Sequence, residues 1–275
     1  MTRTFAVVTD STADLPREWQ TRYGIEVVPL KVLFGKETFR DGVDMSNEQF
    51  FQRLGAATTL PTTSAPSPGE FAEVYRRLAK DHGGCISIHI GAQLSATAEA
   101  ARVGAEAIEG FKVAVIDSQT VSMPVAFLCR VAAESENLDS ATAAVQQRVP
   151  KTRVLALLDT LRYLEMGGRL SRAQAMIGTM LDLKPLLLVA DAEIKPVDRV
   201  RTRSRAVARM VEYFKGDLPV EHMAVMHAQA ADEAEQIAAA LREDFPDGEV
   251  TVGQIGSVLG THTGPKALGI VYIKQ

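Results

Sequence analysis

Four short polar segments hold the side chains of this chain that could do chemistry. They span residues 60–70, 91–95, 167–171 and 260–265, and each follows or interrupts an apolar run. Their hydroxyl, guanidinium and imidazole groups are hydrogen-bond donors that suit a carboxylate or a phosphate. None of the four contains a cysteine, a pair of carboxylates or a cluster of metal ligands. The set therefore favours holding an anionic head group over breaking a bond.

Two candidate nucleophiles leave an enzymatic alternative open. Asp10 ends the first predicted strand, a position at which open α/β sheets bind ligands. It could accept a phosphoryl group, as in haloacid-dehalogenase-type phosphatases, but Thr12 stands where those enzymes usually carry a second acid. Ser95 follows a later strand and could serve a hydrolase. The competing interpretation is structural: Asp10 caps a turn, and Ser95 caps a helix whose free N–H groups also attract anions.

A dense basic stretch crosses a predicted strand end and helix start. It consists of Lys195, Arg199, Arg201, Arg203, Arg205 and Arg209. A solvated charged face explains it, and so does a docking surface for an acidic partner or for phosphates, since a planar guanidinium suits both. A nucleic-acid-binding regulator is a third possibility. The formal net charge of −4, from 30 Lys+Arg and 34 Asp+Glu, disfavours nucleic acid as the partner.

The composition indicates a soluble protein with a sizeable core. Hydrophobic residues make up 46% of the 275 residues and charged residues 23%. No apolar segment approaches the length of a membrane span, so we expect no stable membrane insertion. Cys85 and Cys129 stand alone in apolar surroundings, and the first residues lack a signal-peptide pattern. A cytoplasmic location is therefore expected.

Strands that alternate with helices must position the polar segments. In residues 1–150, apolar runs at 5–10, 85–90 and 112–116 predict strands separated by helices, which implies parallel pairing. Ser46 and Ser67 each precede a Gln or Glu by three residues, a capping-box pattern that predicts helix starts. The first half is thus expected to form a Rossmann-like α/β domain.

A second α/β domain is expected over residues 151–275, after a boundary at Pro150-Lys151. A strand at 153–158 leads to a helical region that continues through 177–181. Residues 186–190 and 193–200 read as an antiparallel hairpin, which makes the second sheet mixed. The fold class predicted is α/β with two domains, and loops from both would form a ligand site between them.

Seven blocks of residues, in a fixed order over essentially the whole chain, make the sequence resemble the DegV family, the lipid-carrying component of bacterial fatty acid kinase systems. The blocks are residues 9–16, 63–68, 94–97, 115–118, 161–164 together with 167–171, 183–185 and 261–265. Each block alone is a weak signal. Their order makes the resemblance specific.

The resemblance implies a carrier with no cofactor, metal or catalytic residue of its own. The carboxyl group of a fatty acid such as palmitate, stearate or oleate would meet Thr63, Ser95 and His262, directly or through water, with Arg169 close by. The neighbouring Thr62 and Ser64 are included among the ligand-binding residues. The acyl tail would run into an apolar tunnel of the N-terminal domain.

The resemblance also implies a protein partner. A kinase subunit would phosphorylate the bound carboxyl with ATP, for phospholipid synthesis, and would contact Arg201 and Arg203. Three departures from the family pattern stand at 123–126, Ala96 and Lys266. The first two are expected to reshape the tunnel, and the third puts a cation near its mouth.

Overall fold

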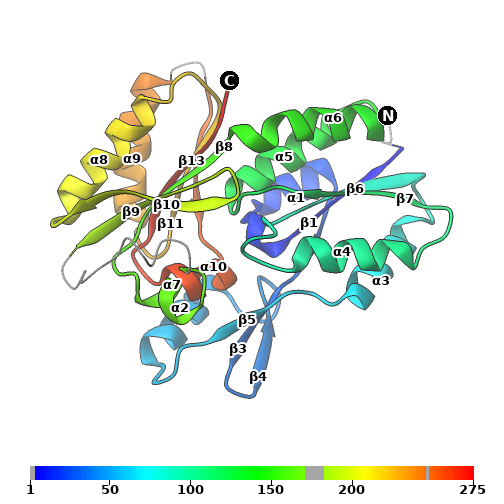
Figure 1. Cartoon of the computed structure of the whole chain (residues 1–275), viewed down its shortest axis with the longest axis horizontal. Helices are drawn as coiled ribbons and strands as arrows, with labels where there is room; N and C mark the ends of the chain where they lie inside the picture. Colours follow the sequence, from blue (N-terminus) through cyan, green and yellow to red (C-terminus); the bar gives the residue numbers. More distant parts are fainter. Residues whose placement is uncertain (1–3, 171–182, 246–247) are drawn as a thin grey trace.

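The computed structural model describes residues 4–170, 183–245 and 248–275, and Figure 1 shows two sheets side by side with a small third sheet below them. The first sheet contains β1 (Ala6–Asp10), β2 (Ile25–Val28), β6 (Gly84–His89) and β7 (Lys112–Asp117). Its order is β2-β1-β6-β7 and all pairs are parallel. The predicted parallel, Rossmann-like sheet is confirmed.

Helices cover both faces of this sheet (Figure 1). One face carries α3 (Pro68–Leu78) and α4 (Thr97–Glu106), and the other carries α1 (Arg17–Tyr23), α5 (Met123–Ala133) and α6 (Leu138–Arg148). The strands are buried on both sides, which explains their continuous apolar runs. Short 3₁₀ turns, η1 (Ser11–Ala13) and η2 (Val149–Lys151), follow β1 and α6.

Both predicted capping boxes form. Ser46 precedes α2 (Asn47–Ala56) and exchanges hydrogen bonds with Gln49, and Ser67 does the same with Glu70 at the start of α3. These motifs are local, so the sequence alone is enough to find them.

The third sheet is small and antiparallel, with the order β4-β3-β5. β3 (Lys31–Phe34) and β4 (Glu37–Arg40) pair across Gly35. β5 (Thr62–Ser64) corrects the sequence analysis, which treated these residues as part of a polar loop. They form an edge strand because β3 offers them a partner, and a partner so distant in sequence leaves no local signal.

The second large sheet has six strands in the order β10-β9-β8-β13-β11-β12. They are β8 (Thr152–Leu157), β9 (Lys184–Ala190), β10 (Glu193–Val200), β11 (Val220–His227), β12 (Val250–Gln254) and β13 (Leu268–Lys274). All pairs are antiparallel except β11 with β12, so the predicted mixed sheet is confirmed. The predicted hairpin is β9–β10, joined by Asp191 and Ala192, both at positive φ as a tight hairpin turn requires.

Alternate residues of the six-stranded sheet face opposite ways. Leu155 and Val225 pack on α8 (Arg203–Lys215) and α9 (Ala231–Asp244), which cover the outer face (Figure 1). Val154 and the other alternate residues face the first half of the chain. This inner face is apolar, and α5 from the first half of the chain covers part of it.

Two short helices of the second half contact each other, α7 (Arg162–Met166) and α10 (Ser257–Thr263). α10 corrects the interpretation of residues 260–265 as a loop. Its first turn is held by side chains from the first half: Asp14 accepts from Gly256 N at 2.9 Å and Asp41 accepts from Ser257 N at 3.2 Å. The predicted helical stretch through 177–181 lies outside the described residues.

No helix in the described ranges combines the length and the apolar character needed to cross a membrane.

Replacing Gly260 with Ala tests how tightly α10 is seated. A Cβ at Gly260 would lie 2.8 Å from ring atoms of both Phe50 and Phe51, which are buried in α2. We expect Gly260→Ala to destabilise the protein by about 1–3 kcal/mol in urea unfolding, despite the better helix propensity of Ala. Gly55→Ala is the matched control, since nothing lies within 4 Å of the Cβ that it adds. We expect it to raise the free energy of unfolding by about 0.5–1 kcal/mol. Equal effects at both positions would contradict this packing.

Candidate functional site

A large apolar cavity lies between the two halves of the chain. It encloses about 1050 Å³ of empty space, including the part that opens to solvent. Inner-face side chains of the six-stranded sheet form one wall, among them Val154, Ala156, Leu187, Val189, Met226 and Val271. Leu30, Ile90 and Val121 approach from the first half.

This cavity is not the tunnel expected within residues 1–150, because both halves of the chain line it. Most lining residues come from beyond residue 151, because α8 and α9 cover only the outer face of the second sheet. The first half contributes mainly the loops that close the cavity. Residues 123–126 and Ala96 do not line it, so the two departures expected to reshape the tunnel do not act there directly.

Six polar residues line the same cavity. They are Thr63, Ser95, Ser122, Arg169, His262 and Thr263. The structure thus brings together four predicted site residues from four separate segments. Ser122 and Thr263 were not among the predicted site residues.

Thr63 and His262 are in direct contact. Thr63 Oγ1 lies 2.9 Å from His262 Nε2. Thr63 points inward from the edge strand β5, whereas its neighbours Thr62 and Ser64 are exposed on the other side and do not line the cavity. Since side chains alternate along a strand, only the middle residue of the three can reach the cavity.

His262 is neutral at physiological pH. Desolvation by burial, and then the charge of Arg169, lower the pKa of His262 to about 4. Its Nδ1 is buried and has no hydrogen-bond partner among the described residues. An unpaired lone pair costs less than an unpaired N–H donor, so we assign the proton to Nε2, which then donates to Thr63 Oγ1. The Thr63 hydroxyl proton is left free to point into the cavity.

Glycine at position 167 lets His262 sit where it does. A Cβ on Gly167 would lie 2.3 Å from His262 Nδ1, a distance no side chain allows. Gly168 adopts φ +70°, which favours glycine for a different reason. The Gly-Gly pair therefore turns the chain into Arg169 and makes room for the imidazole.

Arg169 brings a positive charge to the polar end of the cavity. Its guanidinium donates to the carbonyl oxygens of Gly167, at 2.6 Å, and Leu94, at 3.4 Å. No carboxylate in the described part of the chain pairs with it. A half-buried cation whose partners are neutral leaves room for an anion.

Ser95 does not cap a helix, which corrects that prediction. The N-cap of α4 is Ala96, which makes no side-chain cap bond. Ser95 Oγ instead lies 2.8 Å from Thr97 Oγ1, and Ser95 lines the cavity. Its hydroxyl can donate to a ligand while it accepts from Thr97.

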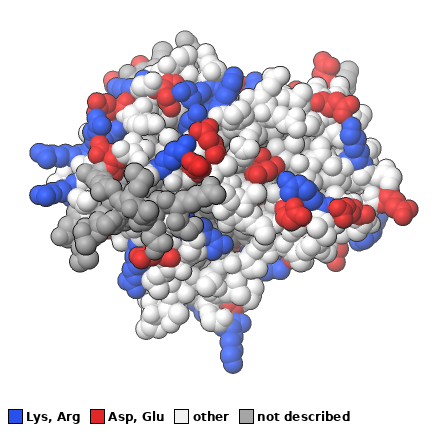
Figure 2. All heavy atoms as spheres, in the orientation of Figure 1, with Lys and Arg blue, Asp and Glu red and all other residues white. Residues whose placement is uncertain are grey.

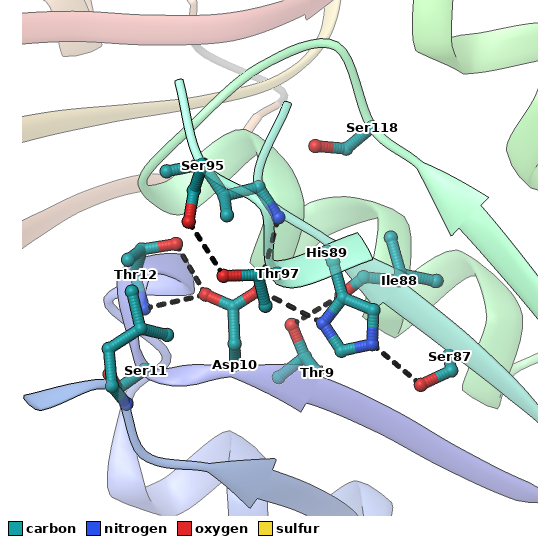
Figure 3. A network of polar contacts seen from close by, with 12 residues as sticks. Thr9, Asp10, Ser11, Thr12, Ser87, Ile88, His89, Ser95, Thr97 and Ser118 are labelled. Carbon is teal, nitrogen blue, oxygen red and sulfur yellow. Dashed lines mark hydrogen bonds and ion pairs between the residues drawn. The ribbon is translucent and has the colours of Figure 1, made fainter. Parts of the chain in front are cut away.

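Asp10 is a structural residue rather than a nucleophile. Figure 3 shows its carboxylate between Thr12 and His89. Oδ1 accepts from Thr12 N at 3.0 Å, and Oδ2 contacts His89 Nδ1 at 3.0 Å and Ile90 N at 3.1 Å. The side chain is fully buried and does not line the cavity. The interpretation as a cap is therefore the one the geometry supports.

His89 extends this network in an arrangement like a Ser-His-Asp triad. Its Nε2 lies 2.7 Å from Ser87 Oγ, as Figure 3 shows. Ser87 Oγ is also 2.8 Å from Tyr75 Oη, and Ser87, His89 and Asp10 are all fully buried. A substrate cannot reach that serine, so the chain of bonds holds the ends of β1 and β6 together.

The basic stretch is largely neutralised by acids of its own chain. Arg203 binds Glu233 through two nitrogens, at 2.7–2.9 Å, and donates to the carbonyl of Lys266. Arg209 pairs with Asp198 and Glu212. Arg201 is exposed. On the face shown in Figure 2, basic and acidic side chains are interspersed rather than gathered into one positive area, which does not favour nucleic acid.

Among the described residues, no group of three or more His, Cys, Asp or Glu side chains could hold a metal ion.

The fold and the site define an α/β protein with an apolar cavity that ends in hydroxyl donors and a cation. The family model described as "Uncharacterised protein, DegV family" matches residues 4–275. A DegV domain-containing protein of Streptomyces coelicolor is 39% identical over 98% of this chain and 99% of its own length. Protein DegV of Bacillus subtilis is 34% identical over 97% of this chain and 98% of its own length. The chain belongs to the DegV family.

Solved structures of the family superpose closely on this fold. DegV from Bacillus subtilis, described as a fatty acid binding protein, gives a TM-score of 0.91 at 32% identity, with 100% of both chains covered. A DegV family protein from Thermus thermophilus, whose structure is described by its fatty acid binding, gives 0.88 at 30% identity and covers 99% of this chain and 100% of its own. The predicted α/β fold class and the family resemblance are confirmed.

The ionisation of His262 can be followed by NMR of its ring nitrogens. We expect the wild-type imidazole to stay neutral as the pH falls to about 4. Arg169→Gln should raise the pKa of His262, because one of the two causes that lower it is removed, while burial still keeps it below 6.5. Since unfolded His262 takes up a proton near pH 6.5, its burial should cost stability as the pH falls from there towards 4. An ordinary titration near pH 6.5 in the folded wild type would contradict this description.

Proposed function

We propose that this protein binds one long-chain fatty acid, such as palmitate, stearate or oleate. The tail lies along the inner face of the six-stranded sheet, and the carboxylate lies among Thr63, Ser95 and Arg169, with His262 fixing Thr63. The observation that carries the proposal is a guanidinium without an acidic partner, among the described residues, at the end of an apolar cavity. The fatty acid binding of the relatives from Bacillus subtilis and Thermus thermophilus supports it.

The two ends of the ligand have different roles. Each buried methylene contributes about 0.8 kcal/mol, so a tail of roughly twelve contributes on the order of 10 kcal/mol before the costs of binding. An ionised carboxylate buried without partners would cost several kcal/mol, and donors at the polar end offset that cost. The tail therefore sets affinity, and the polar end sets orientation.

The protein acts as a carrier rather than as an enzyme by itself. No acidic residue and no cysteine is among the residues that line the described cavity. Within the described part of the chain, Ser95 contacts Thr97 and neither a histidine nor a carboxylate, so it has no general base there, which argues against the hydrolase alternative. We place the protein in the cytoplasm as the substrate-presenting component of a fatty acid kinase system that serves phospholipid synthesis.

A kinase subunit with ATP would phosphorylate the presented carboxylate, a step that depends mainly on positioning. Arg201 is the candidate contact with the kinase subunit, because its segment of the chain lies near the site. Arg203, two residues further on, donates to the carbonyl of Lys266, which is close in sequence to His262. Arg203 is engaged by Glu233 and holds this surface in place. We expect the isolated chain to form no acyl phosphate from ATP and oleate, and to do so when the kinase subunit is added. Formation by the chain alone would show that it is an enzyme itself.

Comparing an acid with an alcohol of equal length isolates the role of Arg169. We expect Arg169→Ala to weaken palmitate binding by about tenfold to a hundredfold, the value of a hydrogen bond to a charged group. Binding of hexadecanol should change little, because it has no negative charge. Arg76→Ala, an exposed arginine on α3, is the control and should leave both affinities unchanged. Isothermal titration of the delipidated wild type and both variants with each ligand measures these affinities, and equal losses for acid and alcohol would count against the proposed head-group site.

A further inference from the structure

Ser122 lines the cavity and is tied to a carboxyl group that the proposed function does not use. Ser122 Oγ lies 2.6 Å from Asp14 Oδ2. Ser122 N–H donates to Thr12 O at 2.9 Å, and Gly91 N–H donates to Thr120 O at 2.8 Å. These bonds place Ser122 at the same sheet edge as the loop that carries Ser95.

The backbone of Ser122 is strained. Its φ of 65° and ψ of −153° lie in a region that is essentially restricted to glycine. The conformation is held by the bond to Thr12 and by Val125 N–H, which donates to Ser122 O at 2.9 Å. Strain of this kind costs stability and is characteristic of functional sites. A serine where the backbone favours glycine therefore points to a role for its side chain.

Asp14 is poorly placed to carry a negative charge. Although part of the residue stays accessible, its carboxyl group is enclosed by protein, and its Oδ1 accepts from Gly256 N at 2.9 Å. The charged groups with the largest effect on the pKa of Asp14 are Asp41 and Asp10, which are both acidic. The start of α10 and the start of α5 offer it only two neutral donors, the Gly256 amide and the Ser122 hydroxyl. Burial, more than these charges, raises the pKa of Asp14 to about 8.

We propose that Ser122 is a further head-group donor and that the proton on Asp14 determines which way its hydroxyl points. This inference rests on the proposed fatty acid binding. With Asp14 protonated, the carboxylic acid donates to Ser122 Oγ, and the serine proton turns towards the ligand carboxylate. With Asp14 ionised, Ser122 donates to Asp14 instead and presents only lone pairs to the cavity. The proton comes from solvent, and no covalent bond other than O–H changes.

The pH dependence of oleate binding tests the pair. Between pH 7 and pH 9 the protonated fraction of Asp14 falls from about nine-tenths to about one-tenth, so wild-type affinity should fall about tenfold. Asp14→Asn keeps an acceptor for Gly256 and an N–H donor for Ser122 at every pH. Its affinity should therefore differ by less than about twofold between the two pH values.

Two further variants separate a binding role from a structural one. Ser122→Gly relieves the backbone strain, so its melting temperature should rise, while its affinity for oleate at pH 7 should fall about tenfold and lose the pH dependence. Thr63→Ala lacks a different donor, so it should bind more weakly and keep the tenfold pH dependence.

The outcomes distinguish this inference from the proposed function. Unchanged pH dependence in Asp14→Asn, or unchanged affinity in Ser122→Gly, would overturn the role of the pair while leaving fatty acid binding intact. Failure of the delipidated wild type to bind oleate at pH 7 would overturn the proposed function and, with it, this inference.

Discussion

The whole structure depends on an apolar sheet face that helices cover only in part. α8 and α9 bury the outer face of the six-stranded sheet, and the inner face meets the first half of the chain only in part. Exposed to water, such a face would be costly, so an apolar occupant stabilises it. The strands that form the wall have their outer residues locked in a second core, so the cavity has a rigid back. A rigid wall of this kind can hold the flexible tail of the proposed fatty acid in one direction.

α10 connects this wall to the polar end. Its start is held by Asp14 and Asp41, its Gly260 sits against two phenylalanine rings of α2, and its last turn carries His262. Residues of the first half therefore hold α10 in position. In turn, α10 places His262, a residue of the second half, beside Thr63. In the proposed function His262 can be neutral and still matter, because it would hold Thr63 in place.

Local signals were enough to predict much of the fold. Apolar runs predicted the parallel strands, the Ser46 and Ser67 patterns predicted two helix starts, and the hairpin around Asp191 was visible as well. α10 was missed because Asp14 and Asp41, which hold its first turn, lie more than two hundred residues earlier. The apolar wall that the six-stranded sheet contributes to the cavity was not predicted, since covering one face of a sheet is a tertiary event. Spacing alone made each head-group residue a weak candidate, and Ser122 was missed because its backbone strain has no sequence signature.

A crystal structure with a fatty acid brominated at its methyl end measures the central claim most directly, because the anomalous signal of bromine fixes the direction of the chain. The account predicts bromine against the inner face of the six-stranded sheet, near residues such as Val154 or Val271, and the carboxylate within about 3 Å of the Thr63 hydroxyl. Bromine at the polar end beside Arg169, or a ligand bound outside this cavity, would contradict it.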